Sequence, residues 1–245
     1  MQDVRFSVIS NEELARDTYR LKLLGDVSQI TRAGQFVNVK IDGFYLRRPI
    51  SVCDLGPCNL TLIYKAVGRG TQALSACRSG DELMVLTGLG NGYDTEKSGS
   101  KPILIGGGVG TPPLYLLCKR LLAEGKQPTV ALGFNSADEV FLKEEFEALG
   151  VKTLLATADG SLGYRGFVTE LINTVEYSYF YACGPEPMLR AVYRTADSSG
   201  QFSFEERMGC GFGACMGCSC KTISGNKRIC KEGPVLEREE IIWTD

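Results

Sequence analysis

The chain has 245 residues, of which 44% are hydrophobic and 23% charged, and its formal net charge at pH 7 is −2. This is the composition of an ordinary globular protein with material for one large domain or several small ones, and the lack of a basic excess argues against nucleic-acid binding. The chain contains no histidine. This excludes Ser-His-Asp and Cys-His catalysis, HExxH zinc sites, and histidine-ligated haem or Rieske clusters, so any metal must be held by Cys, Asp or Glu.

Residues 1–100 predict a β-rich first domain, because short strand-like runs alternate with turns that contain Gly and Asp. The expected strands are Arg5–Ile9, Thr18–Leu23, Gln35–Lys40, Leu60–Ala66 and Glu82–Thr87. Evenly spaced short strands without helical periodicity are typical of a barrel or a sandwich. The polar stretch Tyr93–Lys101 then predicts a linker.

Residues 101–200 predict a second domain, in which strands and helices alternate as in a parallel sheet flanked by helices. The expected strands are Pro102–Ile105, Thr129–Gly133, Lys152–Ala156 and Tyr177–Ala182, and the expected helices are Pro113–Glu124, Val140–Leu149, Phe167–Val175 and Pro187–Ser198. In residues 201–245, Gly and Cys dominate from Ser203 onward, which predicts a small metal-binding module.

A glycine-rich turn, Gly106–Gly110, stands between the first strand and the first helix of the second domain. Glycines let the backbone approach a pyrophosphate, and the N–H groups of the following helix attract it. The alternative is a tight turn without a ligand. The chain lacks a GxGxxG motif followed by an acidic residue, which argues against an ordinary dehydrogenase.

Two further segments carry candidate binding residues. Cys183-Gly-Pro185 follows the last expected strand and should lie at the same carboxyl edge of the sheet as the glycine turn, where open α/β sheets bind ligands. Cys183 either contacts a nicotinamide there or is a buried small residue. In Arg48-Pro-Ile-Ser51, a guanidinium and a hydroxyl suit a phosphate and a ring nitrogen, although Arg47 and Arg48 could equally be a solvated pair.

Four cysteines, Cys210, Cys215, Cys218 and Cys230, follow the pattern C-x4-C-x2-C-x11-C. The spacing of the first three is that of a plant-type [2Fe–2S] site. Structural zinc is the alternative, but zinc sites usually have two separated C-x2-C pairs and this segment has one. Cys220 fits no ligand position. The first residues form no apolar leader, and no apolar run is long enough to span a membrane. Together with the clustered cysteines, this predicts a cytoplasmic protein with reduced thiols.

Taken together, Arg48–Ser51, Gly106–Gly110 and Cys183–Pro185 resemble, in order and spacing, the motifs of the ferredoxin-NADP reductase superfamily over roughly residues 1–200. The resemblance implies an antiparallel FAD-binding β-barrel followed by a nicotinamide-binding α/β domain. The flavin contacts that it implies are Arg48, Pro49, Ile50, Ser51, Ile63, Tyr64, Lys65, Gly70 and Thr71. On the nicotinamide side it implies Gly106, Gly107, Gly108 and Gly110, with Cys183 as the candidate catalytic residue.

Residues 206–218 and 228–235, together with Leu89–Tyr93, are similar to the electron-transfer subunits of class 1B dihydroorotate dehydrogenases. This resemblance covers essentially the whole chain. It implies FAD, a [2Fe–2S] cluster and NAD as cofactors. It also implies an FMN-containing partner subunit that oxidises dihydroorotate in pyrimidine biosynthesis, in an assembly of two copies of each chain.

The sequence supports two details of this hypothesis. No Arg or Lys stands between Phe134 and Lys143 to bind a 2′-phosphate, which favours NAD over NADP. Phe212 and Met216, within the cysteine segment, are more apolar than a solvated cover needs to be, which predicts docking of the partner there.

Two other functions stay open at this point. One is the flavin and [2Fe–2S] subunit of an NADH-dependent ferredoxin:NADP oxidoreductase or a sulfhydrogenase, which shares most of the nucleotide motifs. The other is a regulator that senses flavin or nicotinamide without catalysis, which needs no cluster.

Overall fold

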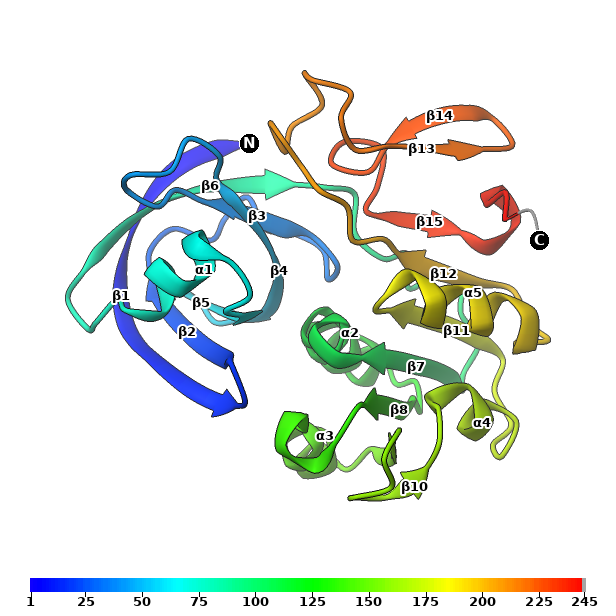
Figure 1. The fold of residues 1–245 in the computed structure, drawn as a ribbon. Coiled ribbons are helices and arrows are strands. Elements are labelled where there is room, and N and C mark those ends of the chain that lie inside the picture. The colour runs from blue at the N-terminus through cyan, green and yellow to red at the C-terminus, as the bar shows by residue number, and fades with distance from the viewer. Residues whose placement is uncertain (244–245) are drawn as a thin grey trace.

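The first domain is a closed antiparallel barrel in the strand order β1-β2-β5-β4-β3-β6 (Figure 1). Its strands are β1 (Gln2–Ala15), β2 (Thr18–Leu24), β3 (Phe36–Val39), β4 (Arg48–Leu55), β5 (Asn59–Lys65) and β6 (Glu82–Leu89). The computed structural model describes residues 1–243. Buried and less buried positions alternate along β6, as expected for a strand with one face in the barrel core. The predicted β-rich first domain is confirmed as an antiparallel barrel.

The barrel also contains a short helix that the sequence did not predict, α1 (Arg69–Ser75). Only Gly70 and Leu74 of this helix are buried. Two buried residues are too few to form the periodic apolar pattern from which a helix is predicted.

The second domain is a seven-stranded sheet in the order β10-β9-β8-β7-β11-β12-β15. Its strands are β7 (Pro102–Gly107), β8 (Thr129–Phe134), β9 (Lys152–Thr157), β10 (Tyr164–Arg165), β11 (Tyr179–Cys183), β12 (Gly200–Ser203) and β15 (Val235–Glu237). All neighbouring pairs are parallel except β12 and β15. Every residue of the central strand β7 is buried, as expected for a parallel strand covered on both faces. The predicted parallel α/β fold is confirmed.

The helices cover both faces of this sheet. They are α2 (Pro112–Ala123), α3 (Lys143–Ala148), α4 (Val168–Ile172) and α5 (Glu186–Thr195), with the 3-10 turns η1 (Gly108–Gly110) and η2 (Ala137–Glu139) at the ends of β7 and β8. Helices α2 and α3 lie on the side facing the barrel, and α4 and α5 lie on the other (Figure 1). Leu114, Leu117 and Leu121 of α2 belong to the same hydrophobic core as the barrel interior. The two domains are therefore packed firmly together.

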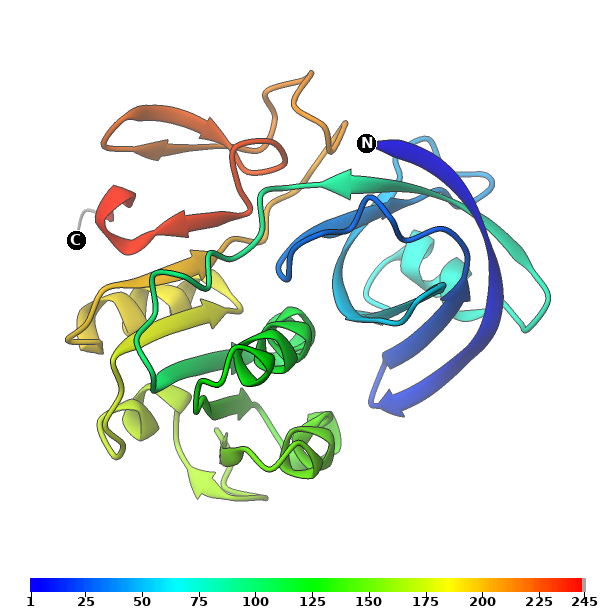
Figure 2. The ribbon, with the colours of Figure 1, turned by 180° about the vertical axis from the view of Figure 1, so that it is seen from behind.

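The cysteine-rich segment is an excursion from the edge of this sheet. After β12 the chain forms a loop and the hairpin β13 (Ser219–Thr222) and β14 (Gly225–Arg228), returns as β15, and ends its described part after η3 (Arg238–Glu240). Both views place the loop between the barrel and the hairpin (Figure 2). The boundary expected between residues 200 and 201 falls inside β12, whose first residue is Gly200 and which pairs with β11. Because β12 and β15 are only four and three residues long, they carry too little alternation to predict.

None of the helices in residues 1–243 is long and apolar enough to cross a membrane.

Candidate cofactor sites

A cavity of about 320 Å³ opens beside β4 and β5 of the barrel. Seven of the nine residues proposed to contact flavin line it: Pro49, Ile50, Ser51, Ile63, Tyr64, Lys65 and Thr71. Its surface is mostly apolar with a few polar groups, which is the usual character of a cofactor pocket. A hydroxyl, an ammonium group and apolar walls together suit a flavin ring.

The other two residues, Arg48 and Gly70, contact each other beside this cavity. The Arg48 guanidinium lies 5.1 Å from the centre of the Phe44 ring and donates a hydrogen bond to the Leu46 carbonyl. A Cβ atom at Gly70 would lie 2.2 Å from a guanidinium nitrogen of Arg48, so a larger residue there would push the guanidinium out of this position. A guanidinium fixed in this way suits a diphosphate.

The remaining wall of this cavity, which we call the flavin cavity, comes from residues that were not predicted to contact flavin. It consists of Phe36, Val67, Val109, Phe204, Glu205, Glu206, Met208 and Pro234. The backbone N–H of Phe204 donates to the Pro234 carbonyl at 2.9 Å, which joins the two ends of the cysteine-rich excursion. Val109 belongs to the glycine turn, and Glu206 and Met208 to the segment before the cysteines, but no local motif signals that they meet at this cavity, because only the fold brings them together.

A second cavity, of about 470 Å³, lies at the carboxyl ends of the parallel strands. It is lined by Gly107 and Gly108, by residues after β8 and β9, and by Pro185, Pro187 and Met188 at the start of α5. The two motifs predicted to share this edge do lie side by side, since Gly106 of β7 is in register with Cys183 of β11. A Cβ atom at Gly110 would lie 2.4 Å from the Cys183 carbonyl oxygen. This geometry suits a dinucleotide.

Cys183 itself lines neither of these two cavities. It is 1% exposed, and burial raises the pKa of its thiol, which also faces Tyr93 and Ser203. A neutral, buried thiol is not a nucleophile. The role of Cys183 as a catalytic residue stays a prediction that this geometry does not support directly.

Glu139 connects the nucleotide cavity to the barrel. It lines the cavity from η2, and its side chain is 11% exposed. Its carboxylate accepts hydrogen bonds from Arg16 at 2.7 Å, Lys65 at 2.9 Å and Asn135 at 2.8 Å. Burial acts to raise the pKa of Glu139, but the bonds from Lys65, Arg16 and Asn135 outweigh it and lower that pKa to about 2.

Arg16 adds a cation that the sequence argument for NAD did not consider. It comes from the turn between β1 and β2 and lies against Asp138 and Glu139, within the segment that has no Arg or Lys of its own. Both of its contacts there are carboxylates, so its charge is already paired.

The four predicted ligand cysteines lie in two pairs. The thiols of Cys210 and Cys215 contact each other, and so do those of Cys218 and Cys230, while the backbone N–H of Cys230 lies 3.4 Å from the sulfur of Cys218. A two-iron cluster takes two thiolates at each iron, so paired cysteines suit it. Within residues 1–243, no three Cys, Asp or Glu side chains are grouped closely enough to hold one metal ion.

The loop around Cys210 favours its thiolate form. Burial acts to raise the pKa of Cys210, but the backbone N–H groups of Phe212, Cys215 and Ala214 outweigh it and lower that pKa to about 6. The Ala214 N–H lies 3.2 Å from the Cys210 sulfur. N–H groups that point at sulfur stabilise a thiolate ligand and tune the potential of an iron–sulfur cluster. Cys220 lies outside this loop, on β13, where burial raises the pKa of its thiol.

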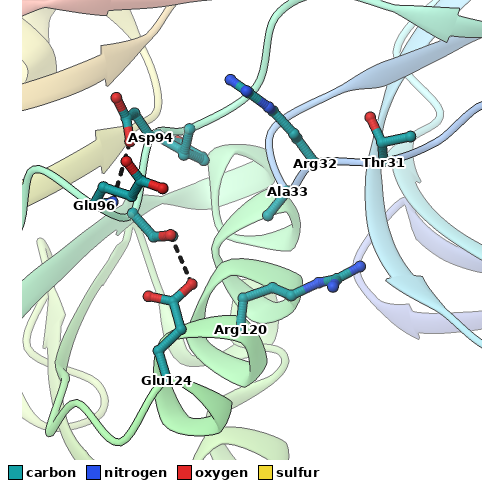
Figure 3. Close-up of a pocket in the computed structure, with 9 residues that line it drawn as sticks. Thr31, Arg32, Ala33, Asp94, Glu96, Arg120 and Glu124 are labelled. Atoms are coloured by element: carbon teal, nitrogen blue, oxygen red, sulfur yellow. Dashed lines mark hydrogen bonds between the residues drawn. The ribbon is translucent and has the colours of Figure 1, made fainter.

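A third cavity, of about 280 Å³, lies between a barrel loop, the interdomain linker and α2 (Figure 3). Arg32 lines it from the barrel loop, Asp94 and Glu96 from the linker, and Arg120 and Glu124 from the end of α2. The Thr95 hydroxyl donates to Glu124 at 2.7 Å. None of the residues proposed from the sequence as site residues lines this cavity, and its mixture of charges selects no ligand.

Family models match two parts of the chain. Residues 104–194 match the oxidoreductase NAD-binding domain, and residues 205–242 match the iron-sulfur cluster binding domain of dihydroorotate dehydrogenase B. These two matches cover the segments that form the nucleotide cavity and the cysteine pairs.

Among solved structures, the chain is similar to one described as an NADH-dependent reduced ferredoxin-NADP oxidoreductase involved in flavin-based electron bifurcation. The TM-score is 0.88, with 28% identity over 97% of this chain and 90% of that one. A phthalate dioxygenase reductase shares the fold, with a TM-score of 0.67 and 19% identity over 79% of this chain and 64% of that one.

Curated relatives match the chain along its length. Dihydroorotate dehydrogenase B (NAD(+)), electron transfer subunit, of Bacillus pumilus is 43% identical, with 98% of each chain covered. The protein of the same description from Shouchella clausii is 42% identical, with 97% of each covered. With its barrel, α/β domain and cysteine-rich excursion, the chain belongs to the family of electron transfer subunits of NAD(+)-dependent dihydroorotate dehydrogenase B, and is an oxidoreductase component.

Proposed function

We propose that this chain carries electrons from a dihydroorotate-oxidising, FMN-containing subunit through a [2Fe–2S] cluster and FAD to NAD+ in pyrimidine biosynthesis. The proposed assembly contains two copies of each chain. We place it in the cytoplasm, where thiols stay reduced, since all ten cysteines are free in the structure.

Separate groups of residues bind FAD and NAD. Arg48 binds the FAD diphosphate, while Ser51 and Lys65 face the cavity in which the flavin ring would lie. Gly107 and Gly108 let NAD approach the end of β7 closely. When bound, FAD supplies the conversion between a hydride exchanged with NAD and the single electrons that a cluster handles.

The observation that carries this proposal is where the flavin cavity lies. Its wall combines the barrel motif with Val109 of the glycine turn and with Phe204–Met208, which lead directly into Cys210. The glycine turn and the residues that lead into the cysteine loop therefore both border one cavity. Electron transfer between two cofactors requires such an arrangement, whereas a sensor has no need of the cysteine loop.

The test uses the purified chain and its candidate partner subunit. We expect flavin bands and broad cluster absorption in the visible spectrum of the chain. We also expect dihydroorotate-dependent reduction of NAD+ only when both subunits are mixed. A chain free of iron, or one whose NADH oxidation gains nothing from the partner, would contradict the proposal.

One observation favours a second candidate, the flavin and [2Fe–2S] subunit of an NADH-dependent ferredoxin:NADP oxidoreductase. It is the TM-score of 0.88 with the structure of such an enzyme. The identity of 28% to that structure is well below the 43% to the Bacillus pumilus electron transfer subunit. NADH-dependent reduction of ferredoxin with no response to the dihydroorotate-oxidising partner would favour this candidate.

A further inference from the structure

Asn38 is a buried polar residue inside an apolar strand. It lies on β3 between Val37 and Val39 and is 1% exposed. On one side it is in register with Pro49 of the flavin motif on β4, and on the other with Leu86 of β6. A buried amide destabilises the fold unless its groups are hydrogen-bonded, so its presence in this strand needs a reason.

The Asn38 side chain reaches the cysteine-rich loop. Its Nδ2 atom donates a hydrogen bond to the Cys210 carbonyl at 3.2 Å, across 172 residues of sequence. A carbonyl can only accept, which fixes the orientation of the amide. Within the described residues 1–243, this is the one hydrogen bond between the barrel and residues 209–218.

The other end of the amide shows that stability alone does not account for Asn38. Its Oδ1 atom is buried and has no hydrogen-bond partner in the structure. An unpaired buried acceptor is unfavourable and rare in native proteins. An apolar side chain of the same size would avoid this penalty, but it could not donate to the Cys210 carbonyl.

The loop is shaped to accept this contact. Gly211 has φ +78°, and a Cβ atom there would lie 2.1 Å from the Asn38 nitrogen. The left-handed glycine thus turns the chain at the point where it touches the barrel. From this turn onward, the N–H of Ala214 points back at the Cys210 sulfur.

We propose that Asn38 is a positioning residue: it anchors the backbone of the first cluster ligand, Cys210, to the barrel strand that pairs with the flavin motif. This inference rests on the proposed function, because it takes Cys210 as a cluster ligand. One short path, from Pro49 across the β3–β4 pairing to Asn38 and on to Cys210, then fixes the cluster loop relative to the flavin site.

Two substitutions remove the donor and keep the size of the side chain, Asn38→Asp and Asn38→Leu. We expect both proteins to retain FAD and to show an altered visible circular dichroism of the cluster. We also expect them to lose iron to a ferrous chelator about tenfold faster than wild type, the effect of one buried hydrogen bond. The control is Asn59→Asp, an exposed asparagine on β5 of the same barrel, which should match wild type in all three measurements.

A third variant attacks the same contact from the loop. Gly211→Ala should change the cluster spectrum and the rate of iron loss in the same direction, because its methyl group displaces the Asn38 amide. Unchanged spectra and rates in the Asn38 variants would overturn the proposal. Loss of FAD together with iron would also overturn it, because it would show a general role in folding. A wild-type chain without iron would instead contradict the cluster assignment, before any variant is made.

Discussion

Arg48 is held in position by the protein alone, between the Phe44 ring, the Leu46 carbonyl and Gly70. A cation fixed in advance loses little freedom on binding a phosphate. We expect Arg48→Ala to weaken FAD binding by roughly 1.5–3 kcal/mol, the range for a hydrogen bond to a charged group. The flavin-to-protein ratio after gel filtration measures the effect.

The matched variant for Arg48 is Arg48→Lys, which keeps the charge but loses the planar fork and should bind FAD with intermediate strength. Iron content should stay at the wild-type value in both proteins, since the cysteine loop does not contact Arg48. Full flavin occupancy in Arg48→Ala would mean that Arg48 is only a solvated residue at the barrel edge.

Each of the four paired cysteines should be needed for the cluster. Replacing any one of Cys210, Cys215, Cys218 or Cys230 by Ala should abolish the cluster absorption and leave FAD bound, because the flavin motif lies in the barrel. Cys220→Ser should be nearly silent, since Cys220 lies on β13 outside the paired thiols. Iron and flavin analysis of each purified variant decides this. Full iron in Cys215→Ala, or its loss in Cys220→Ser, would require a different set of ligands.

The 3-10 turn η2 is joined to the barrel by hydrogen bonds that Arg16 and Lys65 donate to the carboxylate of Glu139. The folded-state pKa of Glu139, about 2, lies below its ordinary value of 4.5. A lowered carboxyl pKa stabilises the fold above the unfolded pKa, and this contribution is lost as the pH falls toward the folded pKa. The stabilisation should therefore be complete at neutral pH and fade between about pH 4.5 and pH 2.

Glu139→Gln tests this contribution. We expect the free energy of unfolding of the variant to be lower than that of wild type by about 2 kcal/mol at pH 7. This value is smaller than the pKa shift alone implies, because Arg16 is half exposed and solvent screens its charge. The difference should shrink as the pH is lowered through 4. Urea unfolding at several pH values measures it, with Glu144→Gln, an exposed position on α3, as the control. A difference that is constant with pH would show that the ion pairs are not its source.

The ends of elements show where local patterns fail. The sequence predicts a helix over Val140–Leu149, but α3 begins at Lys143. Val140 is extended and Leu142 has φ +64°, in the left-handed region. Both are apolar residues in a helix-like pattern, but Phe141 and Leu142 are buried in the core. Packing in the core therefore determines the backbone conformation of Val140–Leu142, although their sequence pattern favours a helix.

At the scale of the whole molecule, the exposed part of the cysteine loop suits a partner. Phe212 is 45% exposed and Met216 53%, on the loop that carries the predicted cluster ligands. Exposed apolar side chains at a redox site favour docking. We expect Met216→Glu to lower the rate of dihydroorotate-dependent NAD+ reduction by about tenfold when the concentration of the partner subunit is limiting. This is the effect expected of a residue at the centre of an interface.

The controls separate docking from damage to the site. Iron and flavin contents of Met216→Glu must equal those of wild type, and Ile9→Glu, an exposed apolar position on β1, should leave the coupled activity unchanged. If saturating partner fails to restore turnover to an intact Met216→Glu protein, or if turnover never falls, the loop is not the docking surface.

The order of the three parts, the fold class and the local motifs could all be predicted from the amino-acid sequence: the motifs are Arg48–Ser51, the glycine turn and the four spaced cysteines. These could be predicted because each depends on neighbours along the chain, such as strand alternation, glycine conformation and ligand spacing. The residues that surround these motifs could not be predicted. Phe204 and Pro234 complete the flavin cavity, Arg16 reaches Glu139, and Asn38 holds Cys210. Each of these contacts joins residues that are far apart in the sequence. No local pattern predicts such a contact, because it forms only when the barrel, the sheet and the excursion between β12 and β15 pack together.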